Sequence, residues 1–170
     1  MITIRPETAE DYAAIHEVNL LAFGQEVEPQ LVDNLRRSPD FIPELSLVAV
    51  EAGRVVGHIL FSPFVIETKD GAVPALTLAP LAVRPESQNQ GIGSELARRG
   101  LEECRRLGHR IVVVVGHPNY YPRFGFSPAR ARGLEAPFPV PDEAFMVLEL
   151  TPGALDGIAG MVRFPPAFGL

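Results

Sequence analysis

One stretch decides the fold that we expect for this chain: Leu81-Ala82-Val83-Arg84-Pro85-Glu86-Ser87-Gln88-Asn89-Gln90-Gly91-Ile92-Gly93-Ser94. It follows an apolar segment, residues 75–83, and it opens a segment with helical spacing of apolar residues that ends before Gly108. Residues 111–115 then read Ile-Val-Val-Val-Val, which is typical of a strand buried on both faces. Strand, loop, helix and buried strand in this order predict a βαβ unit with two parallel strands.

The loop itself has a pattern that suits an anion. Gly91 and Gly93 remove side chains where the backbone turns into the helix, so free N–H groups point outward at the positive end of the helix dipole. No Gly-Lys-Ser/Thr follows, so this is not a Walker loop, and the first glycine of the Rossmann fingerprint is missing. These residues alone leave two interpretations open, a phosphate site and a plain helix start that contains glycine.

The rest of the chain predicts elements around this unit. A strand is expected at residues 2–5 and a late one at 145–150, and helices at about 12–22 and 29–36. Residues 46–50 and 54–61 flank Glu51-Ala52-Gly53, which indicates a hairpin. Pro80 interrupts the strand at 75–83, and because proline donates no hydrogen bond we expect a bulge or splayed pairing there. The fold class is therefore α/β, or α+β.

Composition bounds the class of protein. The 170 residues fit a single domain over 1–170, and no apolar run is long enough for a membrane span. A net charge of −6 makes nucleic acid a poor partner. The lone Cys104 gives no disulfide and no sign of a metal site, and we expect a cytoplasmic protein.

The loop motif, the order of the elements and three further segments together resemble a known family. Gln88-x-x-Gly91-x-Gly93 resembles the motif by which the GNAT superfamily of N-acetyltransferases binds the pyrophosphate of coenzyme A. The order of elements along nearly the whole chain is also similar. The segments Gly57–Ser62, Pro80–Val83 and Tyr120–Phe126 resemble the YhbS-like group of bacterial acetyltransferases.

The resemblance implies a mixed sheet of about six to seven strands, with helices on both faces and a splayed parallel strand pair. It implies acetyl-CoA as the acyl donor and no metal. The residues expected to contact the donor are Leu81, Ala82, Val83, Gln88, Asn89, Gln90, Gly91, Ile92, Gly93, Ser94 and Asn119.

The resemblance also implies a general acid. Tyr121 lies four residues before Gly125-Phe126, where the family often places a tyrosine that protonates the coenzyme A thiolate. Packing on a short turn is the alternative for Tyr121 and for its neighbour Tyr120. The other catalytic candidate is His117, directly after the buried strand.

The general base is harder to place, because residues 77–83 contain no carboxylate. His117 and His58 are candidates, although each is as well explained as a hydrogen-bonded packing residue. Glu26 and Glu28 lie near the turn that shapes the acceptor pocket in the family, or on a solvated surface. The amine could instead arrive neutral, with the protein only positioning it. The arginines at 84, 123, 130 and 132 could reach a phosphate or be solvated.

We therefore expect an enzyme that transfers an acetyl group from acetyl-CoA to a primary amine by direct attack. The alternative is a non-catalytic acyl-CoA-binding or sensing module of the same fold. The acceptor is a small-molecule or protein amine. Dimers are common in the family, and the sequence does not decide between monomer and homodimer.

Overall fold

The computed structural model describes residues 1–169, which form two compact units. The first unit contains residues 1–62 and 79–103, and the second contains residues 63–78 and 104–169. Two strands, β3 (Arg54–Thr68) and β4 (Gly71–Val83), and one helix, α3 (Ile92–Arg106), contribute to both units. Each unit is described separately below.

Four strands form the sheet of the first unit: β1 (Ile2–Pro6), β2 (Ser46–Glu51), the first half of β3 and the end of β4. β1 pairs antiparallel with β2, and β2 pairs antiparallel with β3, with a register shift between Ala49 and Val50. The predicted hairpin is confirmed. Its turn residues Ala52 and Gly53 have φ values of 51° and 77°, a left-handed pair that matches the twist of the two strands.

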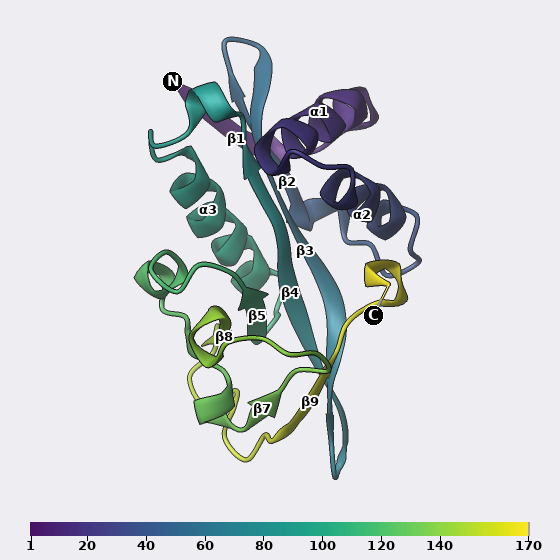
Figure 1. The fold of residues 1–170 in the computed structure, drawn as a ribbon, viewed down its shortest axis with the longest axis vertical. Helices are drawn as coiled ribbons and strands as arrows, with labels where there is room; N and C mark the ends of the chain where they lie inside the picture. The colour runs from purple at the N-terminus through teal and green to yellow at the C-terminus, as the bar shows by residue number, and fades with distance from the viewer. Residues whose placement is uncertain (170) are drawn as a thin grey trace. The chain divides into compact units, whose positions relative to one another are not determined.

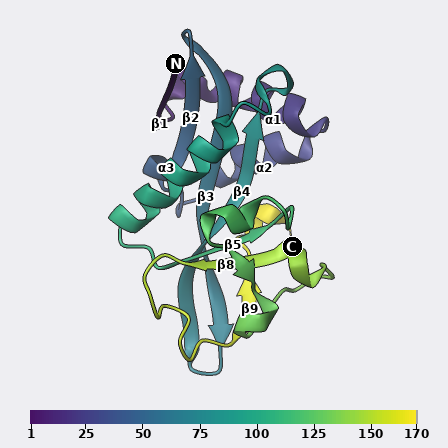
Figure 2. The ribbon, with the colours of Figure 1, turned by 90° about the vertical axis from the view of Figure 1, so that its left-hand side faces the viewer.

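Helices cover both faces of this sheet, as predicted. Helices α1 (Tyr12–Phe23) and α2 (Val27–Arg36) lie on one face and α3 on the other (Figures 1 and 2). The apolar side chains of α1 and α2 with the least exposure are Ile15, Val18, Val32 and Leu35. On α3, the predicted apolar face is confirmed at Leu96, Ala97 and Leu101.

The first helix begins and ends where its sequence predicts. The Thr8 N–H donates to the Asp11 carboxylate at 2.7 Å, which is one half of a capping box on the 3-10 turn Ala9–Asp11 directly before the helix. Arg5 also donates to Asp11, at 2.7 and 3.1 Å, and these bonds hold the pKa of that carboxyl below its usual value. The helix ends at Gly24, which has a φ of 70° and donates to the Leu20 carbonyl.

Two glycines let α3 lie close to β3. A Cβ atom on Gly57 would be 2.9 Å from Leu96 Cδ1 and 3.3 Å from the Ala82 carbonyl oxygen. A Cβ atom on Gly100 would be 2.4 Å from Phe61 Cε1. At each of these points a side chain of one element packs directly on the backbone of the other, Leu96 on Gly57 and Phe61 on Gly100.

The second unit is built on the predicted parallel pair. β4 pairs parallel with β5 (Ile111–Val115) through Leu76 with Val112 and Thr77 with Val113. β8 (Phe145–Glu149) pairs antiparallel with β5, and β6 (Ser127–Pro128) pairs antiparallel with β8. β9 (Gly160–Arg163) pairs antiparallel with the end of β3 and parallel with β7 (Leu134–Glu135).

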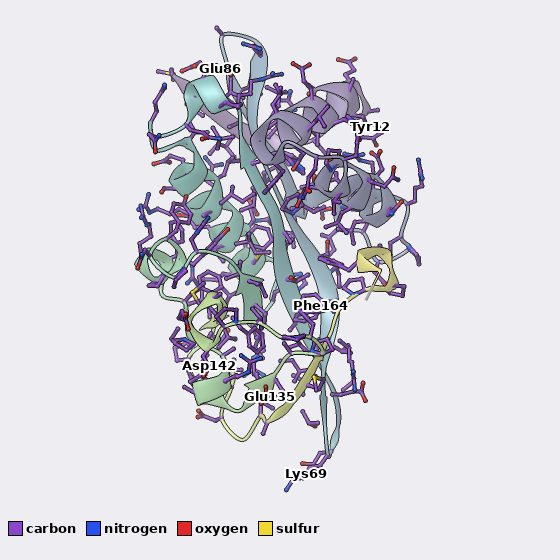
Figure 3. All side chains as sticks on the ribbon, viewed as in Figure 1. Tyr12, Lys69, Glu86, Glu135, Asp142 and Phe164 are labelled. Carbon is purple, nitrogen blue, oxygen red and sulfur yellow. The ribbon has the colours of Figure 1, made fainter. Side chains whose placement is uncertain are left out.

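The core of the second unit joins these strands. Its best buried members are Ile66, Val113, Ala129, Phe145 and Val162, each with an exposed fraction of 0%. Lys69 lies at the tip of the hairpin that connects β3 and β4 (Figure 3). The short 3-10 helices of the chain are Ala9–Asp11, Pro43–Leu45, Pro85–Ser87, Tyr121–Phe124, Arg130–Arg132, Asp142–Ala144 and Pro166–Phe168.

Some expectations need correction. β3 continues to Thr68 and β4 begins at Gly71, so both strands are longer than predicted, and α2 begins at Val27 rather than near Pro29. Within residues 1–169 the sheet has nine strands rather than the expected six to seven, because it also contains β6, β7 and β9, which the sequence did not indicate. Within β4, the Ala79–Pro80 peptide bond is cis. Among residues 1–169, no helix combines the length and apolar character needed to cross a membrane.

Candidate active site

The turn between β4 and α3 is shaped by two left-handed residues. Pro85–Ser87 forms a short 3-10 helix, closed by the Ser87 N–H, which donates to the Arg84 carbonyl at 2.8 Å. Asn89 then has a φ of 63° and Gly91 a φ of 87°. Asparagine and glycine are the residues that adopt this conformation most easily, so the sequence is suited to the reversal.

This turn leaves the first N–H groups of α3 free. The Gly91 carbonyl accepts the first helical bond, from the Glu95 N–H at 3.0 Å. The N–H groups of Gly91, Ile92 and Gly93 have no acceptor within residues 1–169. A Cβ atom on Gly91 would meet nothing within 4 Å, so the space beside it is open. Free donors at the positive end of a 15-residue helix form a site that suits phosphate.

Two glutamine side chains hold the turn from inside. Gln88 Nε2 donates to the Val83 carbonyl oxygen at 3.0 Å, and Gln90 Nε2 donates to the Glu86 carbonyl oxygen at 3.4 Å. Gln88 therefore ties the turn to the last residue of β4. Of the other residues predicted to contact the donor, Ala82 and Ile92 have buried side chains, so only their backbone groups are available.

Arg84 belongs to the packing of the first unit and is not available to a cofactor phosphate. Its side chain is 3% exposed, Nε donates to the Val55 carbonyl oxygen at 2.8 Å, and Nη1 donates to Glu17 at 2.8 Å. The bond from Arg84 also lowers the pKa of the Glu17 carboxyl. The residue fastens the end of β4 to β3 and α1.

Tyr121 begins a 3-10 helix of the second unit and lies among three other rings. Ring centroids of Tyr120, Phe126 and Phe124 lie 5.1, 5.8 and 6.4 Å from that of Tyr121, all at steep interplanar angles. Burial, with a smaller effect of Tyr120, raises the pKa of the Tyr121 hydroxyl above its usual value. Tyr121 therefore keeps its proton at neutral pH, as a hydrogen-bond donor must.

His117 and Asn119 lie on the same loop of the second unit, and both are exposed. Their carbonyl groups stabilise the loop: His117 accepts from the Tyr120 N–H at 3.1 Å, and Asn119 accepts from Arg123 at 3.4 Å. Arg123 also stacks on the Tyr120 ring, 4.4 Å from its centroid.

Other arginines of the second unit are held by acids. Arg130 donates at 2.8 Å to both Glu135 and Asp142, which Figure 3 labels, and Arg132 lies 3.2 Å from Glu149. Because these arginines are paired with carboxylates, they are not free to bind a cofactor phosphate.

His58 is a packing residue of the first unit. Its side chain is 0% exposed, with Nε2 3.0 Å from Ser46 Oγ and Nδ1 3.3 Å from Asn19 Nδ2. Ser46 in turn donates to Glu7, which pairs with Arg36 at 2.7 Å. Burial, and then the charge of Arg36, lowers the pKa of His58 to about 3. A neutral, fully enclosed imidazole is not placed to accept a proton from a substrate.

The acids at the first helix turn have local partners. Glu28 accepts from Gln25 at 2.9 Å, and Glu26 lies 3.3 Å from His16. Among residues 1–169, no cluster of three or more His, Cys, Asp or Glu is arranged to hold a metal ion.

Comparison with known proteins identifies the class that this fold and helix terminus define. Residues 3–129 match the family described as Acetyltransferase (GNAT) domain, and the chain belongs to this family of N-acetyltransferases. The uncharacterised N-acetyltransferase YjhQ of Escherichia coli is 43% identical over 134 residues, which are 78% of this chain and 74% of YjhQ. The uncharacterised N-acetyltransferase YhbS of E. coli is 34% identical over 166 residues, 97% of each chain.

Solved structures agree with this assignment. E. coli YhbS in complex with CoA superimposes with a TM-score of 0.91 at 31% identity, covering 99% of this chain and 92% of that one. A GNAT family acetyltransferase from Brucella melitensis in complex with acetyl-CoA gives a TM-score of 0.81 at 34% identity, covering 99% and 98%. The expected family and fold are thereby confirmed.

Proposed function

We propose that this protein transfers an acetyl group from acetyl-CoA to a primary amine by direct attack of the amine on the thioester. Family membership supports the reaction type, and the complexes of its relatives with CoA and acetyl-CoA support the donor. The observation that carries the proposal is the open N-terminus of α3, with its free N–H groups and the left-handed Gly91.

The donor would be held mainly by backbone groups. The N–H groups of residues 91–94 would bind the pyrophosphate, with Gln88, Asn89 and Gln90 forming the turn before them. Leu81, Ala82 and Val83 would pair with the pantetheine arm, and Asn119 would lie near it. Because backbone donors carry no net charge, this mode of binding suits a protein whose own charge is −6.

The chemistry needs few side chains. The amine nitrogen forms a bond to the thioester carbonyl carbon, the C–S bond breaks, and the sulfur leaves as a thiolate. Tyr121 would donate its O–H hydrogen bond, and then its proton, to that sulfur. The attacking nitrogen loses one proton as the amide forms, and that proton, passed on through solvent, would restore the Tyr121 hydroxyl. No covalent enzyme intermediate is required, and positioning of the two substrates supplies much of the rate.

The proton of the amine has two routes. His117 is exposed and directly follows the strand–Gly116 junction, so it could take the proton. His58 is enclosed and neutral and has no such role. If His117 is not the base, the amine arrives already neutral.

A calorimetric titration with acetyl-CoA tests donor binding, and α3 offers a matched pair of variants. Gly91 and Gly108 lie at opposite ends of the helix, with φ values of 87° and 90°, and a Cβ atom on either meets nothing within 4 Å. Gly91→Glu and Gly108→Glu therefore introduce the same backbone strain, about 1–2 kcal/mol, and the same charge.

We expect wild type and Gly108→Glu to bind acetyl-CoA, and Gly91→Glu to lose at least roughly 10-fold in affinity, because its carboxylate repels the phosphates. Equal binding by the two variants would show that the turn is not part of the acetyl-CoA site. A folded wild-type protein that does not bind acetyl-CoA would overturn the proposed function.

The alternative, a non-catalytic acyl-CoA-binding module, differs in its dependence on Tyr121. Tyr121→Phe keeps the ring and its packing and removes only the hydroxyl. We expect kcat to fall roughly 100-fold with acetyl-CoA affinity unchanged. Donor binding without transfer to any amine of a broad panel would favour the sensing module instead. A cytoplasmic location and a homodimer stay predictions.

A further inference from the structure

The Cε2 edge of the Tyr121 ring lies against a glycine. A Cβ atom built on Gly116 would be 2.4 Å from Tyr121 Cε2, 3.1 Å from Cδ2 and 3.4 Å from Cζ. Cε2 is bonded to the carbon that carries the hydroxyl, so the closest approach is at the reactive end of the ring. Any side chain at position 116 would occupy the space that the ring now fills.

Gly116 is itself fixed in place. It follows the last residue of β5, and its N–H donates to the Ala144 carbonyl at 2.9 Å, which extends the pairing of β5 with β8 by one bond. This backbone cannot retreat from the ring without loss of that hydrogen bond, which would cost about 1 kcal/mol or more.

Two aromatic rings also pack against Tyr121. Tyr120 and Phe126 contact it with interplanar angles of 89° and 78°. The loop that carries these rings is closed by the Gly125 N–H, which donates to the Pro122 carbonyl at 3.0 Å. The position of the Tyr121 ring is therefore limited by the Gly116 backbone on one side and by the Tyr120 and Phe126 rings.

We propose that Gly116 is a positioning residue, which sets the location of the Tyr121 hydroxyl by the absence of its own side chain. This inference rests on the proposed function and deepens it. An added methyl group must move Cε2 from 2.4 Å to an ordinary contact of at least 3.4 Å, a displacement of 1.0 Å. Proton transfer requires donor and acceptor within about 2.6–3.2 Å, so a shift of this size removes the productive geometry.

Gly116→Ala tests the proposal in steady-state kinetics with an amine acceptor. We expect kcat to fall roughly 10- to 100-fold while the KM for acetyl-CoA changes less than about 2-fold. Gly100→Ala is the matched control, because its added Cβ would also be 2.4 Å from a ring carbon, on Phe61. It should lower Tm to a similar extent and leave kcat unchanged.

A purely structural role of Gly116 is separated from a positioning role by combining variants. If Gly116 acts through the hydroxyl, Gly116→Ala should change kcat less than about 2-fold in a Tyr121→Phe background. An equal fall in both backgrounds, or no fall in wild type, would overturn the inference. If Tyr121→Phe alone leaves kcat unchanged, the proposed acid is wrong, which is a different outcome.

A second variant covers the case in which Gly116→Ala does not fold. Tyr120→Leu removes the ring edge whose centroid lies 5.1 Å from Tyr121, and it leaves the glycine in place. We expect a lower kcat with an unchanged KM for acetyl-CoA. An unchanged kcat would show that the site tolerates movement of the ring and would overturn the proposal.

Discussion

The buried histidine of the first unit has its proton on one particular nitrogen. Asn19 Nδ2 can only donate, so Nδ1 of His58 accepts and Nε2 carries the proton. Nε2–H then donates to Ser46 Oγ, and the Ser46 hydroxyl donates to the Glu7 carboxylate. Each group in this series donates a hydrogen bond to the next. The series links α1 to β3 and β3 to β2.

This arrangement predicts how stability depends on pH. The pKa of His58 falls from 6.5 to about 3 on folding, so between these values the unfolded chain binds more protons than the folded one. The stabilising contribution of the uncharged His58 is therefore fully present above about pH 6.5, and it is lost as the pH falls. Between about pH 7 and about pH 5 the loss due to this residue is about 2 kcal/mol in the free energy of unfolding.

Urea unfolding at the two pH values measures that loss. His58→Gln keeps a donor near Ser46 and removes the titration, so its free energy of unfolding should fall about 2 kcal/mol less than that of wild type. Parallel profiles for wild type and His58→Gln would show that the folded protein accommodates a charged imidazole.

At the scale of elements, the sequence predicted the helix ends and turns that depend on residues close by in the chain. Helix α3 begins after Gly91 and ends before Gly108, whose N–H donates to the Arg105 carbonyl while the next N–H, of His109, donates to Cys104. This is the Schellman pattern that a C′ glycine permits. The hairpin at residues 51–54 and the turn before α3 follow from residue types within a few positions.

Elements that depend on distant partners were missed. β6 and β7 have two residues each and exist only through their pairing with β8 and β9, so no periodicity could indicate them. The burial of Arg84 depends on Val55 and Glu17, which are 29 and 67 positions away. The arginines of the second unit are likewise paired with acidic side chains, and only the fold brings these acids close to them.

The candidate site shows the same division. The turn that frees the N–H groups of α3 is local, and its glycine pattern indicated a helix start there while it left open whether that start binds phosphate. The contact between Gly116 and Tyr121 is also short in sequence, but glycine at the end of a strand has many explanations. Only the position of the ring shows why a side chain is excluded there. The sequence therefore indicated the proposed acid, Tyr121, but not the glycine that we propose positions it.

At the scale of the whole molecule, charge and binding act over different distances. The net charge of −6 repels an anionic donor at long range, whereas the N–H groups at residues 91–93 would bind it only at contact. Long-range repulsion governs the association rate, and contact hydrogen bonds govern the dissociation rate. Salt screens the long-range repulsion and has little effect on the contact hydrogen bonds.

Stopped-flow measurement of acetyl-CoA binding should therefore show an association rate that rises roughly 2- to 5-fold between about 20 and about 200 mM salt. The dissociation rate should change less than about 2-fold over the same range. An association rate that falls with salt would mean that local cations outweigh the net charge. The exposed Arg98 and Arg99 on α3 are the candidates, and replacing both with glutamine would then have to abolish the fall.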